Sequence, residues 1–538
     1  MNRRNFIKRT TVAGAGITAF GWNPESEKTS PALFNYATDD NFELNEITIS
    51  ELSEGMASGK YTSRQLVELY LNRIETVDKA GVKLNAVIEV NTDAVSIADA
   101  MDKERAEGNI RGPLHGIPVL VKDNIDTGDK MMTTAGALAL IGNYASADAF
   151  IIKQLRAAGA VILGKTNLSE WANFRSFHSV SGWSSRGHQT KNPYVLDRNP
   201  SGSSSGSAVA VAANLCAVAV GTETDGSIIS PSSVNGIVGL KPTVGLLSRS
   251  GIIPISSTQD TAGPMGRHVE DVAILLSALA SIDPLDPAAS AAEGNISADY
   301  FSALNENALK GVRIGIEKSH LDTGNKSGLL FSEAVKLIKK AGAEIVEIAF
   351  LEAFNALGDA ELTVLEYEFK SGVNKYLSKA EIKFSSLDDI IDYNEKNAAA
   401  AQPYFGQEIL IVSNALGDLQ SPEYISALET SVAAKGIIEK MMSENDLHAL
   451  CGISSGPAWC IDPVNGDSGS GYSFTSPAAM AGFPHVTVPM GLVLGLPVGI
   501  SFMSTAFKEQ EILNYAFAFE QHSHRRTVPQ FIPTIFPE

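Results

Sequence analysis

The sequence has few cysteines and no ligand spacing that would hold a metal. Its 538 residues include three cysteines, Cys216, Cys451 and Cys460. Cys451 and Cys460 are nine positions apart with no third or fourth ligand nearby, which excludes a structural zinc site of the usual spacing. Cys216 stands in an apolar run, which favours a place in the core. A disulfide between Cys451 and Cys460 stays open at this point, because its formation depends on geometry.

The chain also lacks an excess of positive charge and a long apolar run. Its 42 Lys and Arg residues stand against 61 Asp and Glu residues, which gives a formal net charge of −19. A surface this acidic repels phosphate backbones and anionic lipids, so we expect no nucleic-acid partner. No run behind the N-terminal segment is long enough to span a bilayer, so we expect no stable membrane insertion.

No Pro/Ser-rich linker or charge run divides the chain after residue 40. With 44% hydrophobic residues and 46 glycines, the composition is typical of a soluble globular protein with ample core. We therefore expect one large domain over residues 45–535.

The first 30 residues are typical of an export signal and leader. Arg3 and Arg4 are followed by an aromatic residue, an aliphatic residue and a lysine, and residues 10–22 form a short, Gly/Ala-rich apolar stretch. No acidic residue precedes Glu25. This pattern is similar to a bacterial twin-arginine signal, so we expect export to the periplasm; the cleavage site is not evident.

Helical patterns alternate with short apolar runs over the rest of the chain. Thr62 and Gln65 form a capping box before a helical pattern. Further helices are expected over residues 149–158 and 508–522, strands over 118–121, 160–163, 484–489 and 496–501, and a second helix–Gly–strand unit over 331–348. This alternation predicts an α/β protein, a single large α/β/α sandwich with a central mixed sheet covered by helices.

Residues 350–450 are predicted to be helical and contain no motif that carries chemistry. We expect this segment to cover the site and shape access to it, although a purely structural role fits its pattern equally well.

Residues 159–166 match the phosphate-loop pattern GxxxxGK[ST] by letter. The four intervening residues are Ala-Val-Ile-Leu, which favour a strand, and Gly159 caps the preceding helix. We therefore reject a phosphate site here.

Residues 202–206 match GxSxG, the nucleophile elbow of α/β-hydrolases, with Ser204 at its centre. That elbow needs an apolar strand directly before it, whereas residues 197–201 are typical of a turn. Because candidate base histidines exist at His268, His448 and His485, an esterase remains the alternative.

Three other residues favour acyl transfer without a histidine. Lys122 ends a predicted buried strand, where loss of solvent lowers the proton affinity of a lysine and makes it a general base. Ser227 follows Asp225-Gly226 at a predicted turn and would be the nucleophile. Backbone N–H groups from Thr224 to Ser227 could face a developing oxyanion, and Ser203 would connect the lysine with the nucleophile.

From about residue 45 to 530 the chain closely resembles the amidase signature family. The resemblance rests on residues 116–124, 134–137, 159–170, 202–207, 221–227 and 236–243. Residues 182–186, 221–227 and 259–265 are most similar to the branch that contains bacterial peptide amidase.

This resemblance implies a Ser-cisSer-Lys triad: Ser227 as nucleophile, Ser203 as a bridge held by a cis peptide bond to Gly202, and Lys122 as base. It further implies oxyanion contacts from Thr224, Asp225 and Gly226, no cofactor or metal, and hydrolysis of a small-molecule or peptide carboxamide through an acyl-enzyme. Many members have Gly-Gly-Ser-Ile-Arg at the nucleophile, whereas this chain has no such arginine, which removes any role for it.

An amidotransferase A-like subunit is the alternative within the family, although the export signal and the acidic composition argue against a partner that acts on tRNA. The identity of the amide and the oligomeric state stay open.

Overall fold

The computed structural model describes residues 42–321, 324–469 and 471–536. All of them belong to one unit, Asp39–Glu538, which is described here by itself. The predicted export signal at residues 1–30 lies outside the described residues.

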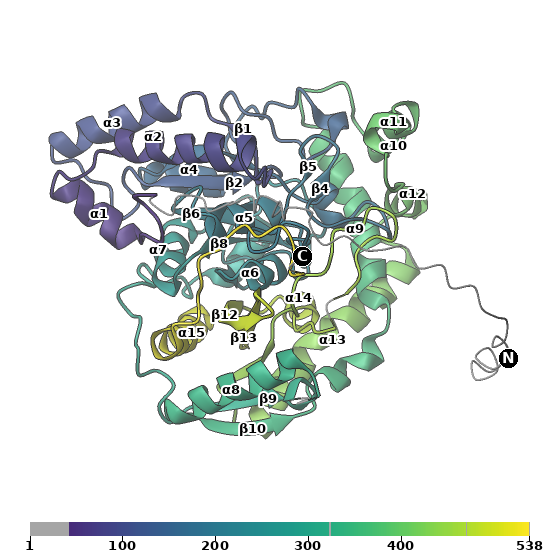
Figure 1. Cartoon of the computed structure of the whole chain (residues 1–538). Coiled ribbons are helices and arrows are strands. Elements are labelled where there is room, and N and C mark those ends of the chain that lie inside the picture. Colours follow the sequence, from purple (N-terminus) through teal and green to yellow (C-terminus); the bar gives the residue numbers. More distant parts are fainter. Residues whose placement is uncertain (1–41, 322–323, 470, 537–538) are drawn as a thin grey trace, which may run out of the picture. The chain divides into compact units, whose positions relative to one another are not determined.

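One large mixed sheet organises this unit (Figure 1). In the order in which they lie side by side, its strands are β1 (Val87–Val90), β3 (Val161–Thr166), β2 (Pro118–Lys122), β6 (Val218–Glu223), β8 (Thr261–Gly266), β7 (Val238–Lys241), β12 (His485–Val493), β13 (Leu496–Met503), β11 (Ala449–Ile453), β9 (Arg313–Glu317) and β10 (Glu344–Ile348). Strands β3, β2 and β6 are parallel, whereas β6 pairs with β8 and β12 pairs with β13 in antiparallel fashion. A separate two-stranded sheet pairs β4 (Trp183–Ser184) with β5 (His188–Gln189).

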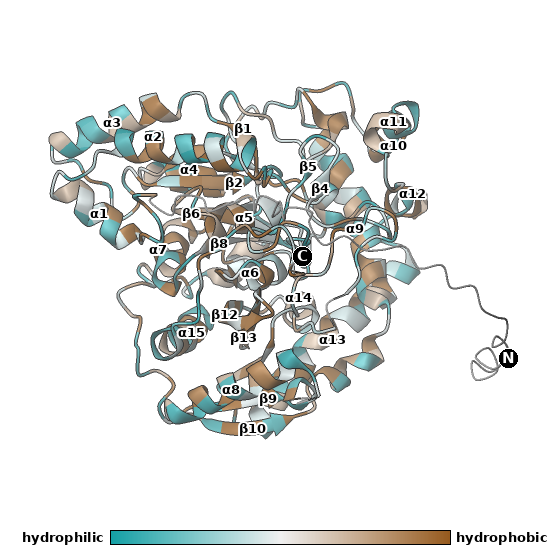
Figure 2. Ribbon diagram, in the orientation of Figure 1, coloured by the Kyte–Doolittle hydropathy of each residue, from teal (hydrophilic) through white to brown (hydrophobic). Residues whose placement is uncertain are grey.

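Helices flank the sheet, as the sequence predicts for an α/β sandwich. They are α1 (Ile49–Ala57), α2 (Ser63–Arg73), α3 (Ala94–Ala106), α4 (Phe150–Ala157), α5 (Ser205–Ala212), α6 (Ile229–Val234), α7 (Val269–Leu279), α8 (Lys326–Lys340), α9 (Ala360–Leu377), α10 (Leu387–Lys396), α11 (Ala398–Ala401), α12 (Glu408–Ala415), α13 (Pro422–Glu444), α14 (Ser476–Ala481) and α15 (Glu509–Ser523). Figure 2 shows hydrophobic colour in strands such as β2 and much hydrophilic colour along α3. The predicted fold class is confirmed.

Local expectations hold where near neighbours decide the structure. Thr62 is the N-cap of α2, and it exchanges hydrogen bonds with Gln65 as a capping box does. Strand β2 ends at Lys122, as expected. Segment 350–450 is mainly helical, from α9 to α13.

Strand β3 is longer than the expected 160–163, because it continues through Lys165 to Thr166. The buried Lys165 ammonium donates to the Ile125 carbonyl at 2.6 Å and to Thr133 Oγ1 at 3.0 Å, so its charge is hydrogen-bonded inside the core. A continuous strand across Gly164 also confirms that no phosphate loop forms here.

All three cysteines are free, so Cys451 and Cys460 do not pair. Cys451 is buried in β11, whereas Cys460 is exposed and lies beside Arg198. Within the described ranges, no group of three or more His, Cys, Asp or Glu residues is arranged to hold a metal ion. Across the same part of the chain, no helix is both long and apolar enough to cross a membrane.

Candidate active site

Two parallel strands bring the first polar groups of the site together. Strands β2 and β6 are neighbours in register, with Val121 opposite Val220. Parallel strands have their carboxyl ends at one edge of a sheet, which is where ligands bind in α/β proteins. Lys122 at the end of β2 therefore meets Thr222 near the end of β6, and Lys122 Nζ lies 2.9 Å from Thr222 Oγ1.

Lys122 is fully buried and bonded to two serines. Its Nζ lies 2.8 Å from Ser203 Oγ and 3.0 Å from Ser204 Oγ, and 3.2 Å from the Thr222 carbonyl oxygen. Burial lowers the pKa of Lys122 from 10.5 to about 7, while the negative charges of Asp260 and Glu223 act in the opposite direction. Near neutral pH this lysine is therefore able to give up and regain a proton.

The peptide bond between Gly202 and Ser203 is cis, as the family resemblance implies. Glycine is required at 202, because a Cβ there would lie 2.2 Å from Ser169 Oγ. The Ser203 carbonyl accepts a hydrogen bond from the Ser169 N–H at 3.2 Å. These contacts fix the backbone that presents the Ser203 hydroxyl to Lys122.

Ser204 does not sit on a nucleophile elbow, so the interpretation as an α/β-hydrolase esterase is wrong. Residues 199–204 contain no strand, and Ser204 is the N-cap of α5. Its hydroxyl donates to the Thr222 carbonyl at 2.9 Å. No described hydrogen bond joins it to the candidate histidines; the His485 ring, for example, is buried against Ser501.

Ser227 lies on the turn between β6 and α6, with its side chain 7% exposed. Gly226 has a φ of +73°, a left-handed value that favours glycine in this turn. The N–H of Ser204 donates to the Ser227 carbonyl at 3.1 Å, which ties the two serine segments together.

The turn at 224–227 leaves backbone donors available. Glu223 Oε2 accepts the N–H groups of Ile228 at 2.7 Å and Ile229 at 2.9 Å. In the described part of the chain, the N–H groups of Asp225, Gly226 and Ser227 have no protein acceptor. Unpaired backbone N–H groups beside a serine hydroxyl are the donors that an oxyanion requires.

Two contacts to the side of this turn were not anticipated from the sequence. Thr224 Oγ1 donates to Asp260 Oδ1 at 2.5 Å, and Gln259 Nε2 donates to the Thr224 carbonyl at 3.3 Å. Gln259 Nε2 also donates to Glu361 Oε1 at 2.8 Å, which connects α9 with the turn. Residues 259–265 carried part of the family resemblance, which was a signal for Gln259 and Asp260; nothing in the sequence pointed to Glu361.

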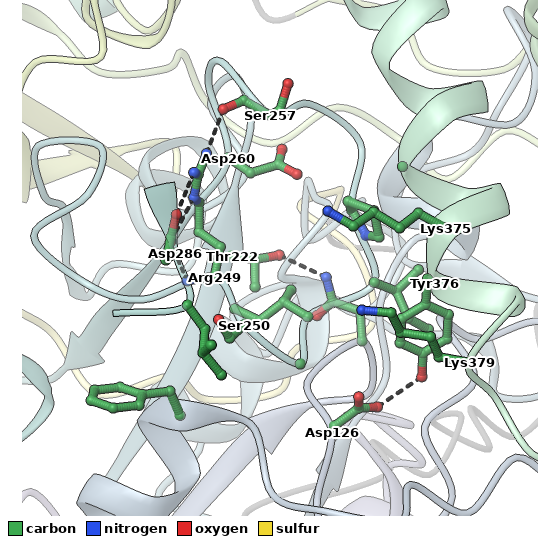
Figure 3. Close-up of a pocket in the computed structure, with 18 of the residues that line it drawn as sticks. Asp126, Thr222, Arg249, Ser250, Ser257, Asp260, Asp286, Lys375, Tyr376 and Lys379 are labelled. Carbon is green, nitrogen blue, oxygen red and sulfur yellow. Dashed lines mark hydrogen bonds and ion pairs between the residues drawn. The ribbon is translucent and has the colours of Figure 1, made fainter. Parts of the chain in front are cut away.

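A cavity of about 1010 Å³ lies beside these groups (Figure 3). Asn124, Thr222 and Thr224 line it, so it reaches the residues that surround the Lys122 ammonium. Lys375, Tyr376 and Lys379 extend into it from the α9 side, which places part of segment 350–450 on the cavity wall.

Most acidic groups on the cavity wall have partners. Asp286 pairs with Arg249 at 2.6 Å, and the Tyr376 hydroxyl donates to Asp126 at 2.8 Å. Lys375 and Lys379 are exposed and form no ion pair within the described ranges. Although the chain as a whole is acidic, positive charge is therefore available at this wall.

A lysine of lowered pKa, two serines and unpaired backbone donors at one edge of an α/β sheet define a serine hydrolase with a lysine base. The chain belongs to the Amidase family, because the model of that family matches residues 65–513. It is an amidase, and a Ser-cisSer-Lys triad is characteristic of this family.

Individual relatives agree with this assignment. The chain is 42% identical over 501 residues to a probable amidase of Arabidopsis thaliana, covering 91% of this chain and 93% of the relative. It is 34% identical over 487 residues to a glutamyl-tRNA(Gln) amidotransferase polypeptide of Pseudomonas savastanoi pv. phaseolicola, covering 89% and 98%. The solved structure of the native peptide amidase from Stenotrophomonas maltophilia aligns with a TM-score of 0.87 and 45% identity, covering 91% of this chain and 99% of that one.

Proposed function

We propose that this amidase hydrolyses the C-terminal carboxamide of peptides to a carboxylate and ammonia, through an acyl-enzyme on Ser227. The observation that carries the proposal is the 2.8 Å contact between the buried Lys122 Nζ, whose pKa is about 7, and Ser203 Oγ. This contact joins a base that is neutral at working pH to a hydroxyl that relays its effect.

In the acylation step, neutral Lys122 takes the proton of Ser203, and Ser203 takes the proton of Ser227. Ser227 Oγ attacks the amide carbonyl carbon and forms a tetrahedral intermediate. The N–H groups of Thr224, Asp225, Gly226 and Ser227 stabilise its negative oxygen. The C–N bond then breaks, and the Ser203 hydroxyl donates a proton to the leaving nitrogen while Lys122 returns one to Ser203.

In the second step, water attacks the ester formed on Ser227. Lys122 and Ser203 accept the proton of the water, and the same N–H groups stabilise the second oxyanion. Collapse returns a proton to Ser227 and releases the carboxylic acid, which ionises in solution. The cycle consumes one water molecule and releases one ammonia.

The peptide part of the proposed substrate rests on two observations. The cavity of about 1010 Å³ exceeds the space that a simple amide needs, and it reaches the residues around Lys122. The peptide amidase from Stenotrophomonas maltophilia shares 45% identity, against 34% for the amidotransferase relative. A hydrolase is therefore favoured over an amidotransferase A-like subunit.

The test is a hydrolysis assay on C-terminal peptide amides, aryl amides and fatty amides with release of ammonia or amine as the readout. We expect turnover of peptide amides, loss of about 10³-fold or more in kcat in Lys122→Ala and Ser227→Ala, and a smaller loss in Ser204→Ala. Loss in Ser204→Ala together with full activity in Lys122→Ala would contradict the mechanism. Absence of turnover with every peptide amide would contradict the substrate.

We propose, further, that the enzyme is exported through the twin-arginine route and acts in the periplasm. The support is the sequence Asn2-Arg3-Arg4-Asn5-Phe6-Ile7-Lys8 ahead of a short apolar stretch. Fusion of residues 1–41 to a fluorescent protein, expressed in bacteria with and without a working twin-arginine translocase, tests it. Export that persists when both arginines are changed to lysine, or when the translocase is absent, would reject this route.

A further inference from the structure

Asn124 is a buried side chain on the cavity wall with an unused oxygen. It is 3% exposed and follows β2 by two residues. Its Oδ1 is buried and has no hydrogen-bond partner in the described part of the chain. Because buried polar atoms in folded proteins are nearly always hydrogen-bonded, such an orphan at a cavity points to a ligand atom that completes it.

The orientation of the Asn124 amide group is held from both sides. Its backbone carbonyl accepts the N–H of Ile253 at 2.8 Å, and its Nδ2 donates to Thr222 Oγ1 at 3.0 Å. With Nδ2 on Thr222, the remaining oxygen is the half of the amide that is free to accept a hydrogen bond.

Asn143, on the same cavity wall, shows what a structural asparagine does there. Its Nδ2 donates to the Thr133 carbonyl at 2.8 Å and to the Tyr376 hydroxyl at 3.0 Å. Its side-chain oxygen is not among the buried atoms that lack a partner. Position on this cavity wall alone therefore does not leave an asparagine oxygen unused.

Asn124 is also close to the reacting groups in terms of contacts. Thr222 Oγ1 receives both Asn124 Nδ2 and Lys122 Nζ, and Lys122 Nζ contacts Ser203 Oγ. The amide group is thus three hydrogen bonds away from the hydroxyl that protonates the leaving nitrogen. Glu223, Asp225 and Gln259 near the nucleophile each have a buried acceptor oxygen without a partner as well, so this region has unused acceptors for N–H donors.

We propose that Asn124 Oδ1 accepts a hydrogen bond from an N–H group of the substrate and thereby helps the enzyme to select amides. This inference rests on the proposed function. Two N–H groups have the required chemistry: that of the scissile carboxamide, and that of the backbone amide one residue before it. An ester oxygen at either place carries no hydrogen, and its lone pairs would face the Asn124 oxygen without a bond.

The experiment compares matched substrates in the full-length enzyme. The reference is an N-acetyl dipeptide amide. The first analogue is the methyl ester of the same peptide, which lacks the scissile N–H, and the second is a depsipeptide amide in which an ester replaces the preceding backbone N–H. The ratio of kcat/KM between the reference and each analogue is measured for wild type, Asn124→Ala and Asn124→Asp.

We expect Asn124→Ala to lower one of these ratios by about 10- to 100-fold relative to wild type, since a site that hydrogen-bonds an N–H rejects the analogue that lacks it. The ratio that falls identifies which N–H is bound. Asn124→Asp keeps an acceptor oxygen but loses the donation to Thr222, so it retains most of the discrimination even if its overall rate falls.

The matched control is Asn143→Ala, in which both ratios stay at the wild-type values. Equal loss of activity on all three substrates in Asn124→Ala would mean that Asn124 acts only through Thr222 and Lys122, and would overturn the inference. A fall in the ratio in Asn124→Asp as large as in Asn124→Ala would also overturn it. Failure of the proposed function itself is distinguishable, because wild type would then not hydrolyse the reference amide.

Discussion

Lys122 and Ser203 are both completely buried, and Lys122 Nζ lies 2.8 Å from Ser203 Oγ. The two residues are 81 positions apart in the sequence, so tertiary structure alone creates the contact. Because burial removes solvent from the ammonium while two serines and Thr222 remain within hydrogen-bonding distance, the neutral form of the lysine is stabilised at the place where a base is needed.

The first prediction is an acid limb in the pH profile of kcat/KM. Burial lowers the pKa of Lys122 to about 7, so the lysine is protonated and inactive as a base below this pH and neutral above it. kcat/KM should fall about tenfold per pH unit below the limb and reach a plateau above it. A limb near the ordinary lysine value of 10.5 would contradict Lys122 as the base.

Asp260→Asn provides the matched test of this assignment. The negative charge of Asp260 raises the pKa of Lys122 against the effect of burial. Removal of that charge should move the acid limb to lower pH, although kcat also falls because Thr224 loses its charged acceptor. A limb that moves to higher pH would show that another group titrates.

The second prediction concerns Gln259, a positioning residue. Gln259→Leu removes the donation to the Thr224 carbonyl and to Glu361, which lets the oxyanion turn move. We expect kcat to fall about tenfold with little change in KM, since the turn acts on the transition state rather than on ground-state binding. Gln510→Leu on α15 is the control and should keep wild-type kcat; a change confined to KM in Gln259→Leu would contradict the positioning role.

The third prediction concerns the buried ion pair of Arg175 and Glu170. The Arg175 guanidinium also donates to the carbonyls of Ala401 and Gly406, so it connects segment 398–406 with the core. Arg175→Ala leaves the Glu170 carboxylate buried without a cation, and we expect the free energy of unfolding to fall by about 3–5 kcal/mol.

Chemical denaturation measures this loss, and limited proteolysis should reveal faster cleavage near residues 398–406. The double variant Arg175→Met, Glu170→Met removes both charges and should recover a large part of the stability. If the single and double variants were equally destabilised, the buried charge would not be the cause.

The fourth prediction concerns the two lysines of α9 at the cavity. Lys375 and Lys379 are exposed and unpaired within the described residues, so we expect peptide amides with acidic side chains to bind better than basic ones. Lys375→Glu with Lys379→Glu should lower kcat/KM for an acidic peptide amide by about 3- to 10-fold, with an effect that weakens as salt increases. Lys440→Glu on α13 is the control with the same charge change; an equal effect there would indicate general electrostatics instead of this wall.

Several features could be predicted because they depend on residues close in the sequence. The Thr62–Gln65 capping box and the end of β2 at Lys122 follow from local hydrogen bonding and from apolar runs. The rejection of a phosphate loop at 159–166 followed from the strand preference of four aliphatic residues. The true end of β3 was missed, because Lys165 stays in the strand only through its contacts with Ile125 and Thr133.

The side contacts of the site could not be predicted in the same way. Thr222, Gln259 and Glu361 come from β6, the loop before β8, and α9, and no periodic pattern connects them. Asn124 stood inside a motif, but its unused oxygen became evident only once its neighbours were placed.

By itself, the sequence determined the chemical groups and the family: a lysine after a buried strand, two serine-rich turns with their glycines, and an α/β alternation. Tertiary structure decided which serine does what. Ser204, at the centre of a GxSxG match, lies at the start of α5 and bonds to the Thr222 carbonyl, whereas Ser227 lies beside the unpaired N–H groups. The physical reason is the parallel pairing of β2 and β6, which places the end of one strand against the end of the other and buries Lys122 between them.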